Sequence, residues 1–351
     1  MALSTLYKTR IAGVASAVPK EIISNSDYTV ISPEQREKII KYTGIQYRRW
    51  ARREVCCSDL CFAAAEKLLS ELGWNRDEIG AIIFVTQTPD YPYPASAQIL
   101  QDRLKLPESC IAYDINLGCS GYTYGLFLLG TLLESSGIRK GLLLAGDASK
   151  TMGDHDPASA ILFGHAASAT AMEFSPENNC PLYFEMGSDG NGFEVICVPG
   201  GGCRNPLETK TFERQDLEGG GARGDLDVIL DAAEIINFTM REIPPSLDRL
   251  LTYCNRTREE IDAYLFHQAN GFINKQVARK AKLRPEQVPS SLYNFGNTSS
   301  ATIPLTLTTE FRERLNQGPA KVVMSGFGVG LSWASVYWEA DGGVFPELVE
   351  V

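Results

Sequence analysis

The chain contains the same order of strands and helices twice, and this repeat constrains the fold more than any other feature. In the first passage, apolar runs of strand length alternate with helical patterns of apolar residues. The strands are expected at 81–85, 110–115 and 141–145, and the helices over about 95–104 and around Leu126 to Leu133. Such alternation is typical of an α/β architecture, in which helices cover a largely parallel sheet.

The second passage follows the same order with similar spacing. Its strands are expected at 263–266, 291–294 and 322–325, separated by a basic helix and by a second helix that follows a Gly-Asn-Thr-Ser turn. From Phe84 to Cys119 is 35 residues, and from Phe266 to Asn297 is 31. Asn297 therefore occupies the place in the second passage that Cys119 has in the first.

The repeat divides the chain into two similar halves and a connection. The halves are expected at 1–175 and 225–351, each with a sheet between helices. The loop-rich region 176–224 is the expected linker. Its two glycine triplets, at 200–202 and 219–221, do not open a helix directly after a strand, so they predict turns rather than a dinucleotide or phosphate loop.

Charge and cysteine content limit the class of protein. A formal net charge of -10 argues against nucleic acid as a partner, because phosphate binding needs a surplus of Lys and Arg. No apolar run could span a bilayer and no signal segment is evident, so we expect a cytoplasmic protein without membrane contact. The nine cysteines then predict reduced thiols. Cys56, Cys57 and Cys61 lack the second ligand pair of a zinc site, so no metal is expected.

Cys119 is the candidate nucleophile. It lies between Gly118 and Ser120, just after a buried strand and at the start of an apolar helix. The unpaired N–H groups at a helix N-terminus favour a thiolate, and a thiolate can attack a thioester. A small buried cysteine with a packing role is the alternative.

Two further residues lie where an α/β sheet builds its site. His267 directly follows the strand at 263–266, at the carboxyl end where open α/β sheets bind ligands. His165, in an apolar stretch, predicts a structural role, and His155 predicts a loop residue. Asn297 by itself is typical of a turn, but with Cys119 and His267 it completes a set at equivalent ends of the repeat.

The chain resembles the β-ketoacyl-acyl carrier protein synthase III group of the thiolase superfamily over nearly its whole length. The resemblance runs from Ile11–Pro19 and Thr43–Ile45 to Gly326–Trp333. The segments at 114–121, 267–270 and 296–299 match the catalytic Cys, His and Asn of that family, in the same order.

The resemblance implies a duplicated thiolase fold with five layers, αβαβα, a homodimer, and a decarboxylating Claisen condensation without metal or redox cofactor. Cys119 would take an acyl group from a thioester, giving ping-pong kinetics. His267 and Asn297 would then stabilise the enolate of a malonyl-type extender. The backbone N–H groups of Cys119 and Val329 would form the oxyanion hole. Asn270 is expected to bind substrate.

Several positions depart from the family pattern. Val329 stands where Gly is common, His165 replaces an Asp, and Tyr93 is the aromatic residue expected to cross the dimer and limit the acyl pocket. At the entrance, Lys38, Tyr42 and Phe272 stand where well-studied members have the Trp and Arg residues that bind coenzyme A.

A basic set recurs at near-helical spacing after His267, and its members are Lys275, Arg279, Lys280 and Lys282. It is either a solvated helix face or a docking patch for an anionic acyl carrier protein. Together with the changed entrance, it favours an acyl carrier protein over coenzyme A as the donor.

Four other functions are compatible with parts of this pattern. A same-fold acyltransferase could pass the acyl group to an oxygen or nitrogen acceptor without decarboxylation, and a chalcone-synthase-like polyketide synthase could extend it repeatedly. A catalytically silent subunit is disfavoured by the intact Cys, His and Asn. A cysteine protease uses the same three residue types, but the duplicated α/β pattern argues against that fold.

Overall fold

The computed structural model describes residues 2–149 and 155–351, and it contains two large sheets. The N-terminal sheet has the strand order β17-β2-β8-β7-β5-β6. Its strands are β2 (Thr9–Val18), β5 (Ile79–Val85), β6 (Ile111–Ile115), β7 (Lys140–Asp147), β8 (Ala166–Phe174) and β17 (Val349–Glu350). The strands β5, β6 and β7 are parallel to one another, so their carboxyl ends meet at one edge.

The C-terminal sheet has the order β1-β9-β16-β15-β14. Its strands are β1 (Ala2–Leu6), β9 (Leu182–Ser188), β14 (Ala263–Phe266), β15 (Ala320–Gly328) and β16 (Ser332–Ala340). The order β2-β8-β7-β5 in the first sheet corresponds to β9-β16-β15-β14 in the second, which confirms the duplicated α/β fold.

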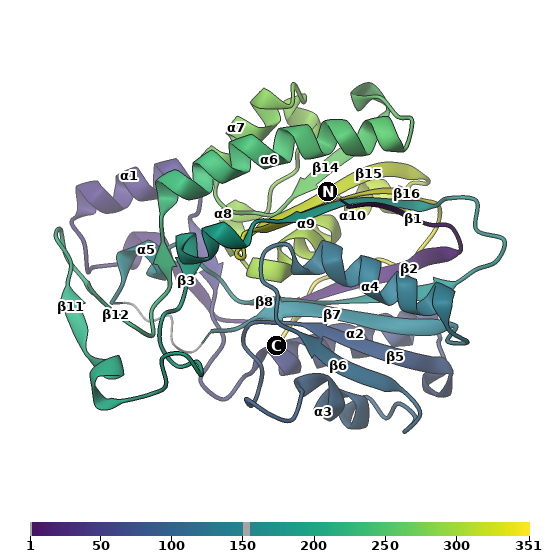
Figure 1. Cartoon of the computed structure of the whole chain (residues 1–351), viewed down its shortest axis with the longest axis horizontal. Coiled ribbons are helices and arrows are strands. Elements are labelled where there is room, and N and C mark those ends of the chain that lie inside the picture. Colours follow the sequence, from purple (N-terminus) through teal and green to yellow (C-terminus); the bar gives the residue numbers. More distant parts are fainter. Residues whose placement is uncertain (1, 150–154) are drawn as a thin grey trace.

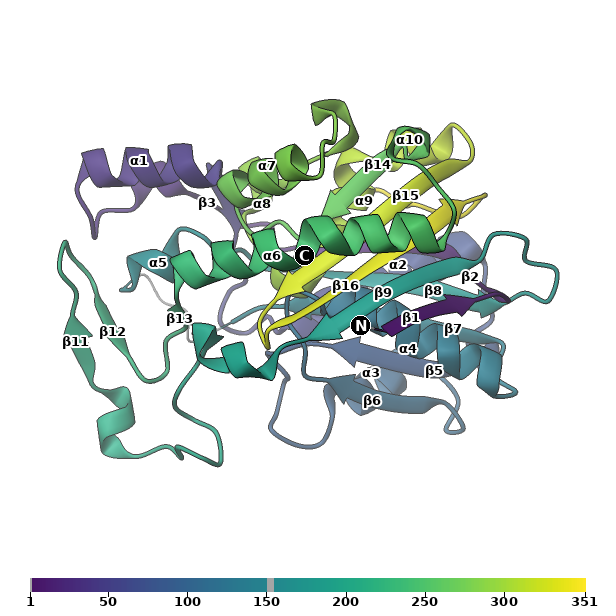
Figure 2. The same ribbon diagram turned by 45° about the horizontal axis from the view of Figure 1, so that its top comes forward.

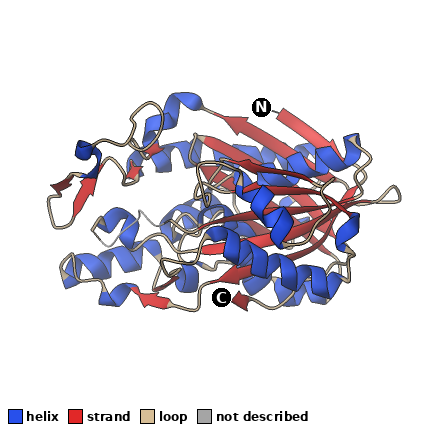
Figure 3. Cartoon of the chain, turned by 90° about the horizontal axis from the view of Figure 1, so that it is seen from below, coloured by secondary structure: helices blue, strands red, loops and turns tan. Residues whose placement is uncertain are grey.

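Helices make the other three layers. The outer helices on the N-terminal sheet are α2 (Cys57–Leu72) and α3 (Ser96–Arg103), and those on the C-terminal sheet are α6 (Ala232–Tyr253) and α7 (Gly271–Lys280). Between the sheets lie α4 (Gly121–Ser135) and α9 (Thr302–Glu310), each of which contacts both sheets (Figure 1). Seen from below, helices lie in front of the strands (Figure 3). The order is therefore the five-layered αβαβα that the sequence predicted.

The apolar side chains follow these layers. The largest buried cluster lies between the sheets and joins Leu126 and Leu129 of α4 to Leu143 of β7 and Met324 of β15. Separate clusters lie under α2 and α3 and under α6 and α7. Because α4 is buried against two sheets, it is apolar around most of its circumference, and its first turn is held firmly.

One predicted strand is wrong. The residues expected as a strand at 291–294 form a short helix, α8 (Leu292–Phe295). Leu292 and Phe295 are buried while the two residues between them are exposed, which is the spacing of a helical turn and not of a strand. Gly296 then ends the helix with φ +66. The second sheet consequently lacks a counterpart of β6.

The sheets do not follow the expected boundaries of the halves. β1 begins the chain but pairs with β9 in the C-terminal sheet, while β17 ends the chain and pairs with β2 in the N-terminal sheet. β9 lies inside the expected linker 176–224, and it pairs with β16. Figure 1 shows the two termini beside opposite sheets. The short β1 and β17 carry little hydrophobic signal, so sequence patterns alone do not assign them.

Most of the remaining elements surround one end of the sheets. They are α1 (Pro33–Thr43), α5 (Pro157–Ala160), β3 (Ile22–Ser24), β4 (Tyr47–Arg49), β10 (Ile196–Cys197), β11 (Arg214–Asp216), β12 (Ala222–Gly224) and β13 (Ile229–Leu230). Figure 2 shows α1, α5 and the β11–β12 hairpin together at that end. The short helix α10 (Arg312–Asn316), which precedes β15, lies at the opposite end. The triplet 219–221 forms the hairpin turn at positive φ, as a glycine turn should. None of the helices in the described ranges is long and apolar enough to cross a membrane.

Candidate active site

Cys119 lies in a tight turn between β6 and α4. The Gly121 N–H donates to the Gly118 carbonyl at 2.7 Å, and Ser120 is the N-cap of α4. The end of β15 presses against this turn. A Cβ on Gly328 would lie 2.8 Å from Cys119 Sγ, and one on Gly326 would lie 2.9 Å from the Cys119 carbonyl. Glycine is therefore required there because the two segments approach so closely.

The environment of Cys119 differs from the sequence prediction in one respect. Cys119 is partly accessible through the cavities that open onto it, but it lies deep in the fold. That burial raises the pKa of the thiol to about 11, although the backbone N–H groups of Val329 and Cys119 lower it. This direction is opposite to the one that the sequence predicted for the thiol. Burial outweighs the helix N-terminus, so the sulfur keeps its proton at neutral pH.

His267 follows β14 and is held as a neutral ring. It is 2% exposed, and burial lowers its pKa to about 3. Its Nδ1 lies 2.9 Å from the Thr302 hydroxyl, which itself lies 2.9 Å from the Ser299 carbonyl. A hydroxyl can accept from Nδ1–H or donate to a bare Nδ1. When the hydroxyl of Thr302 accepts from Nδ1–H, Nε2 of His267 has no hydrogen and can act as a base. When the hydroxyl donates to Nδ1, Nε2 has the hydrogen and can act as a donor.

Asn297 is fixed by the loop before β8. Its N–H donates to the Leu162 carbonyl at 2.9 Å, and its carbonyl accepts from the Gly164 N–H at 3.0 Å. The side-chain oxygen accepts from the Ser299 N–H at 2.9 Å, which directs the amide nitrogen away from that turn. The nitrogen has one long contact, 3.5 Å, to the Ala269 carbonyl. Its second hydrogen is available as a donor.

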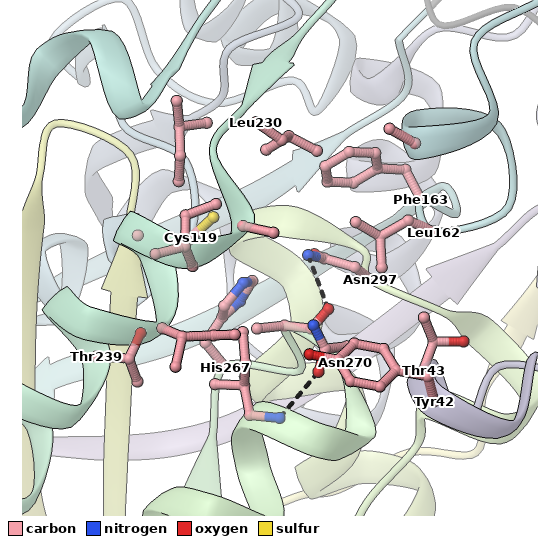
Figure 4. Close-up of a pocket in the computed structure, with 18 of the residues that line it drawn as sticks. Tyr42, Thr43, Cys119, Leu162, Phe163, Leu230, Thr239, His267, Asn270 and Asn297 are labelled. Carbon is pink, nitrogen blue, oxygen red and sulfur yellow. Dashed lines mark hydrogen bonds between the residues drawn. The ribbon is translucent and has the colours of Figure 1, made fainter. Parts of the chain in front are cut away.

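Cys119, His267 and Asn297 line one cavity of about 450 Å³, which we call the entrance cavity. Figure 4 shows the three side chains facing the same space from different parts of the fold. Most of the wall is apolar and comes from α1, α5, α6 and α7, including Ile39, Ile161, Ile235 and Ile273. Such a channel suits a long, thin and largely uncharged arm better than a charged substrate.

A second cavity, of about 500 Å³, shares Cys119 and Asn297 with the first. Its wall includes hydrogen-bonding side chains, among them Gln87, Thr88, Asn116 and Asp147. His267 does not line it. The thiol of Cys119 thus lies where two cavities of different polarity meet.

The three predicted substrate-binding residues are placed differently. Asn270 lines the entrance cavity and caps α7, with its side-chain oxygen accepting from the Ile273 N–H at 2.9 Å. Val329 lines the second cavity, and its N–H lies against the Cys119 sulfur. Tyr93 is 86% exposed and lines neither cavity of its own chain.

The basic set lies on α7 and just after it. Lys275, Arg279, Lys280 and Lys282 are all exposed, and none forms an ion pair within the described ranges. The other end of α7 borders the entrance cavity through Ile273. At the mouth, Tyr42 and Phe272 stack on each other with ring centroids 4.8 Å apart, and Lys38 is exposed nearby on α1.

The other two histidines are tied to the scaffold. The Nδ1 of His165 accepts from the Ala51 N–H at 3.0 Å, and the ring stacks on Trp50 at 4.1 Å. His155 lies 2.7 Å from the Asp227 carboxylate. No group of three or more His, Cys, Asp or Glu side chains with metal-binding geometry occurs within residues 2–149 and 155–351.

Two site residues were missed in the sequence. Thr302 is the first residue of α9, five positions after Asn297. A Thr among other small residues has no sequence pattern that marks it as a site residue. Asp147 is the last residue of β7 and lines the second cavity. The reasoning that selected His267, a polar residue at the end of a buried parallel strand, applies equally to Asp147 and could have found it.

Comparisons with known proteins agree over the whole length. Family models for 3-oxoacyl-[acyl-carrier-protein (ACP)] synthase III match residues 113–190, and those for its C-terminal part match 251–340. A β-ketoacyl-[acyl-carrier-protein] synthase III of Rhodopirellula baltica is 31% identical over 95% of this chain and 99% of its own length. Cys119 lies in the first matched range, and His267 and Asn297 lie in the second.

Solved structures of related proteins also match this chain over nearly its whole length. A 3-oxoacyl-(acyl-carrier protein) synthase from Burkholderia xenovorans matches with a TM-score of 0.93 and 38% identity, covering 100% of this chain and 99% of that one. The 3-oxoacyl-(acyl carrier protein) synthase III of Pseudomonas aeruginosa matches with a TM-score of 0.83 and 26% identity, covering 96% and 99%. The likeness therefore includes both sheets and all five layers.

Proposed function

Because the chain belongs to the 3-oxoacyl-[acyl-carrier-protein] synthase III family, we propose that Cys119, His267 and Asn297 carry out its reaction. The chain is a condensing enzyme that transfers acyl groups. The observation that carries the residue assignment is that these three side chains, from three separate elements, line one cavity. The narrow apolar channel leads to the nucleophile and suits the arm of a carried thioester.

The first step is transfer of an acyl group to Cys119. The thiol proton passes to Nε2 of neutral His267 as Sγ attacks the thioester carbonyl, and the developing oxyanion accepts from the N–H groups of Cys119 and Val329. The bond to the carrier sulfur then breaks, and the proton leaves with that sulfur. A neutral thiol beside a neutral imidazole provides this proton transfer without prior ionisation.

The second step is decarboxylation and condensation with a malonyl-type thioester. Asn297 Nδ2–H and His267 Nε2–H donate to the thioester oxygen, where negative charge develops as carbon dioxide leaves. The resulting carbanion attacks the acyl carbonyl on Cys119, and the bond between that carbonyl and Sγ breaks. The departing thiolate then takes up one proton from solvent, which restores the thiol. Asn297 supports condensation over simple transfer to an oxygen or nitrogen acceptor, because transfer forms no enolate that would need this donor.

We propose an acyl carrier protein as the acyl donor, and a homodimer as the working form. The exposed cations lie on α7 and just after it, and the first turn of the same helix borders the entrance cavity, so an anionic carrier docked on α7 could reach the cavity with its arm. Tyr42 and Phe272 stack on each other at the mouth, and no Arg is among the described residues that line the entrance cavity and could pair with phosphate groups. Exposed Tyr93 supports a partner that covers it.

Half-reactions of single variants test the residue assignment. Cys119→Ala should form no acyl adduct in intact-mass measurements with acyl-carrier thioesters. Asn297→Ala should still be acylated, while release of carbon dioxide from malonyl thioester should fall about 100-fold or more, as when an oxyanion donor is removed. A stable adduct on Cys119→Ala, or equal loss of both half-reactions in Asn297→Ala, would contradict the assignment.

A further inference from the structure

The second cavity contains a buried carboxylate that the proposed reaction does not use. Asp147 is 8% exposed and lines this cavity together with Cys119. Burial raises its pKa, against the lowering effects of Ser299 and of the donors at 86–88. Burying a carboxylate costs free energy unless both of its oxygens accept hydrogen bonds. The partners of each Asp147 oxygen therefore bear on its role.

Only one oxygen of Asp147 is fully paired. Oδ1 accepts from the Gln87 N–H at 2.7 Å, from the Thr86 hydroxyl at 3.1 Å and from the Thr88 hydroxyl at 3.2 Å. These donors hold the carboxylate in one orientation. Oδ2 is buried and accepts no hydrogen bond of normal geometry from the described residues, although the Ser299 side chain lies close enough to lower the pKa of the carboxyl. Asp147 therefore lies in the wall of the cavity with one acceptor oxygen whose hydrogen bonding is incomplete.

The surroundings of Asp147 add polar groups beside the nucleophile. The Gln87 side-chain oxygen lies so near the Cys119 turn that a Cβ on Gly118 would come within 2.2 Å of it. Asn116 and Thr88 also line the wall. The entrance cavity, in contrast, is lined mainly by Ile, Leu, Ala and Pro. An acyl group that only needed an apolar surface would gain nothing from these groups, and their desolvation would oppose its binding.

Resting on the proposed function, in which the carrier arm occupies the entrance cavity, we infer that the acyl group enters the second cavity. We propose that Asp147 selects acyl groups that carry a hydrogen-bond donor, a hydroxyl or an ammonium group, over purely apolar ones. The donor would pair with Oδ2, while Oδ1 stays bound to the loop at 86–88.

Matched thioesters test this directly. Small N-acetylcysteamine thioesters avoid any dependence on the carrier, and the acyl groups butyryl, 3-hydroxypropanoyl and 3-aminopropanoyl differ only in a terminal methyl, hydroxyl or ammonium group. Heptanoyl, 6-hydroxyhexanoyl and 6-aminohexanoyl repeat the comparison with a longer reach. The rate of Cys119 acylation, followed by intact mass, should be about tenfold or more higher for a donor-bearing member than for its methyl counterpart at one of the two lengths.

Asp147→Asn separates the two kinds of donor. It keeps the shape and one acceptor oxygen, so it should abolish the preference for the ammonium group and reduce the preference for the hydroxyl, with the methyl series unchanged or faster. Asp90→Asn is the matched control, because Asp90 is a part-buried carboxylate that pairs with Ser58 and lines neither cavity. It should keep the wild-type ratios.

The outcomes distinguish this inference from the proposed function. Acylation of Cys119 by all members at similar rates, or a wild-type preference for the methyl members, would overturn the role of Asp147 and leave the proposed function standing. Unchanged ratios in Asp147→Asn would also overturn it. No acylation of wild type by any thioester would overturn both. If Asp147→Asn fails to fold, the wild-type ratios alone decide.

Discussion

At the scale of single residues, Cys119 and His267 form a pair in which burial keeps both groups neutral. Burial raises the pKa of the thiol and lowers that of the imidazole, so neither is ionised at neutral pH. Such a pair is inert toward reagents that need a free thiolate, yet it can transfer its proton to a thioester held in the cavity. Selectivity for the bound substrate follows from this arrangement.

Alkylation and acylation of Cys119 should therefore depend on pH in different ways. Iodoacetamide reacts with the thiolate, so its rate at Cys119 should rise about tenfold per pH unit from pH 7 until the pH approaches the pKa of about 11. Acylation by a thioester uses the neutral thiol and His267, whose pKa is about 3, so its rate should be nearly constant from about pH 6 to about pH 9.

Peptide mapping by mass spectrometry measures both rates, and the exposed Cys203 is the internal control for the reagent. Rapid alkylation of Cys119 near pH 7, together with acylation that falls as pH drops through about 7, would show that the thiolate is present in the free protein and that this account of the pair is wrong.

At the scale of elements, how much the sequence could predict depended on the strength of hydrophobic patterns. The buried parallel strands β5, β7 and β14 are continuous apolar runs, so they and the residues at their ends could be located. The structure of the segment at 291–294 could not be predicted in this way. Four residues of mixed polarity fit either a strand or a helical turn, and tertiary packing decides between them. Cys119 and His267 were found because each lies at the end of such a run. The hydroxyl of Thr302 has no comparable marker.

The basic face of α7 gives a prediction at this scale. Lys275 and Arg279 are one turn apart, both are exposed, and neither forms an ion pair with a described acidic residue. Reversing both charges, Lys275→Glu with Arg279→Glu, should slow acylation by an acyl carrier protein about tenfold at low salt and less at high salt, because the loss is in electrostatic steering. Acylation by the matching coenzyme A thioester should change little.

A double reversal on the opposite outer layer is the control. Lys67 of α2 and Lys105 after α3 are exposed and belong to surface pairs that contribute little stability. Lys67→Glu with Lys105→Glu changes the net charge equally and should leave the carrier reaction unchanged. A wild-type enzyme that is acylated faster by the coenzyme A thioester, or an α7 variant with an unchanged salt dependence, would contradict carrier docking on α7.

At the scale of the whole molecule, the exchange of terminal strands ties the two sheets together. β1 and β17 each complete the sheet of the other half, so neither half has its full set of strands without the other end of the chain. Unfolding should then be cooperative across both halves. β6 is the edge strand of the N-terminal sheet, and its side chains Ile111 and Tyr113 are exposed.

This edge is the surface on which a second copy of the chain should pair. β6 ends the N-terminal sheet, with Ile111 43% and Tyr113 37% exposed, and Tyr93 and Tyr91 lie exposed on the preceding loop. An exposed strand edge with apolar side chains has unpaired backbone N–H and C=O groups and can pair with a strand of another chain. If the β6 strands of two copies paired with each other across a twofold axis, each strand would cover the exposed edge of the other copy's sheet.

Sedimentation velocity should accordingly give the mass of a dimer for the wild type and of a monomer for Ile111→Glu with Tyr113→Glu, because charges of the same sign would face each other across the axis. The control variant Tyr293→Glu changes a more exposed aromatic residue, on α8, and should remain dimeric. The monomeric variant should also be acylated more slowly at Cys119. Gln87 and Asn116, which line the second cavity, lie at the carboxyl ends of β5 and β6, where Tyr93 of the other copy would cover them in the dimer. A monomeric wild type, or an edge variant that stays dimeric, would exclude β6 as the contact, and a monomer with unchanged acylation would show that each chain closes its own acyl cavity.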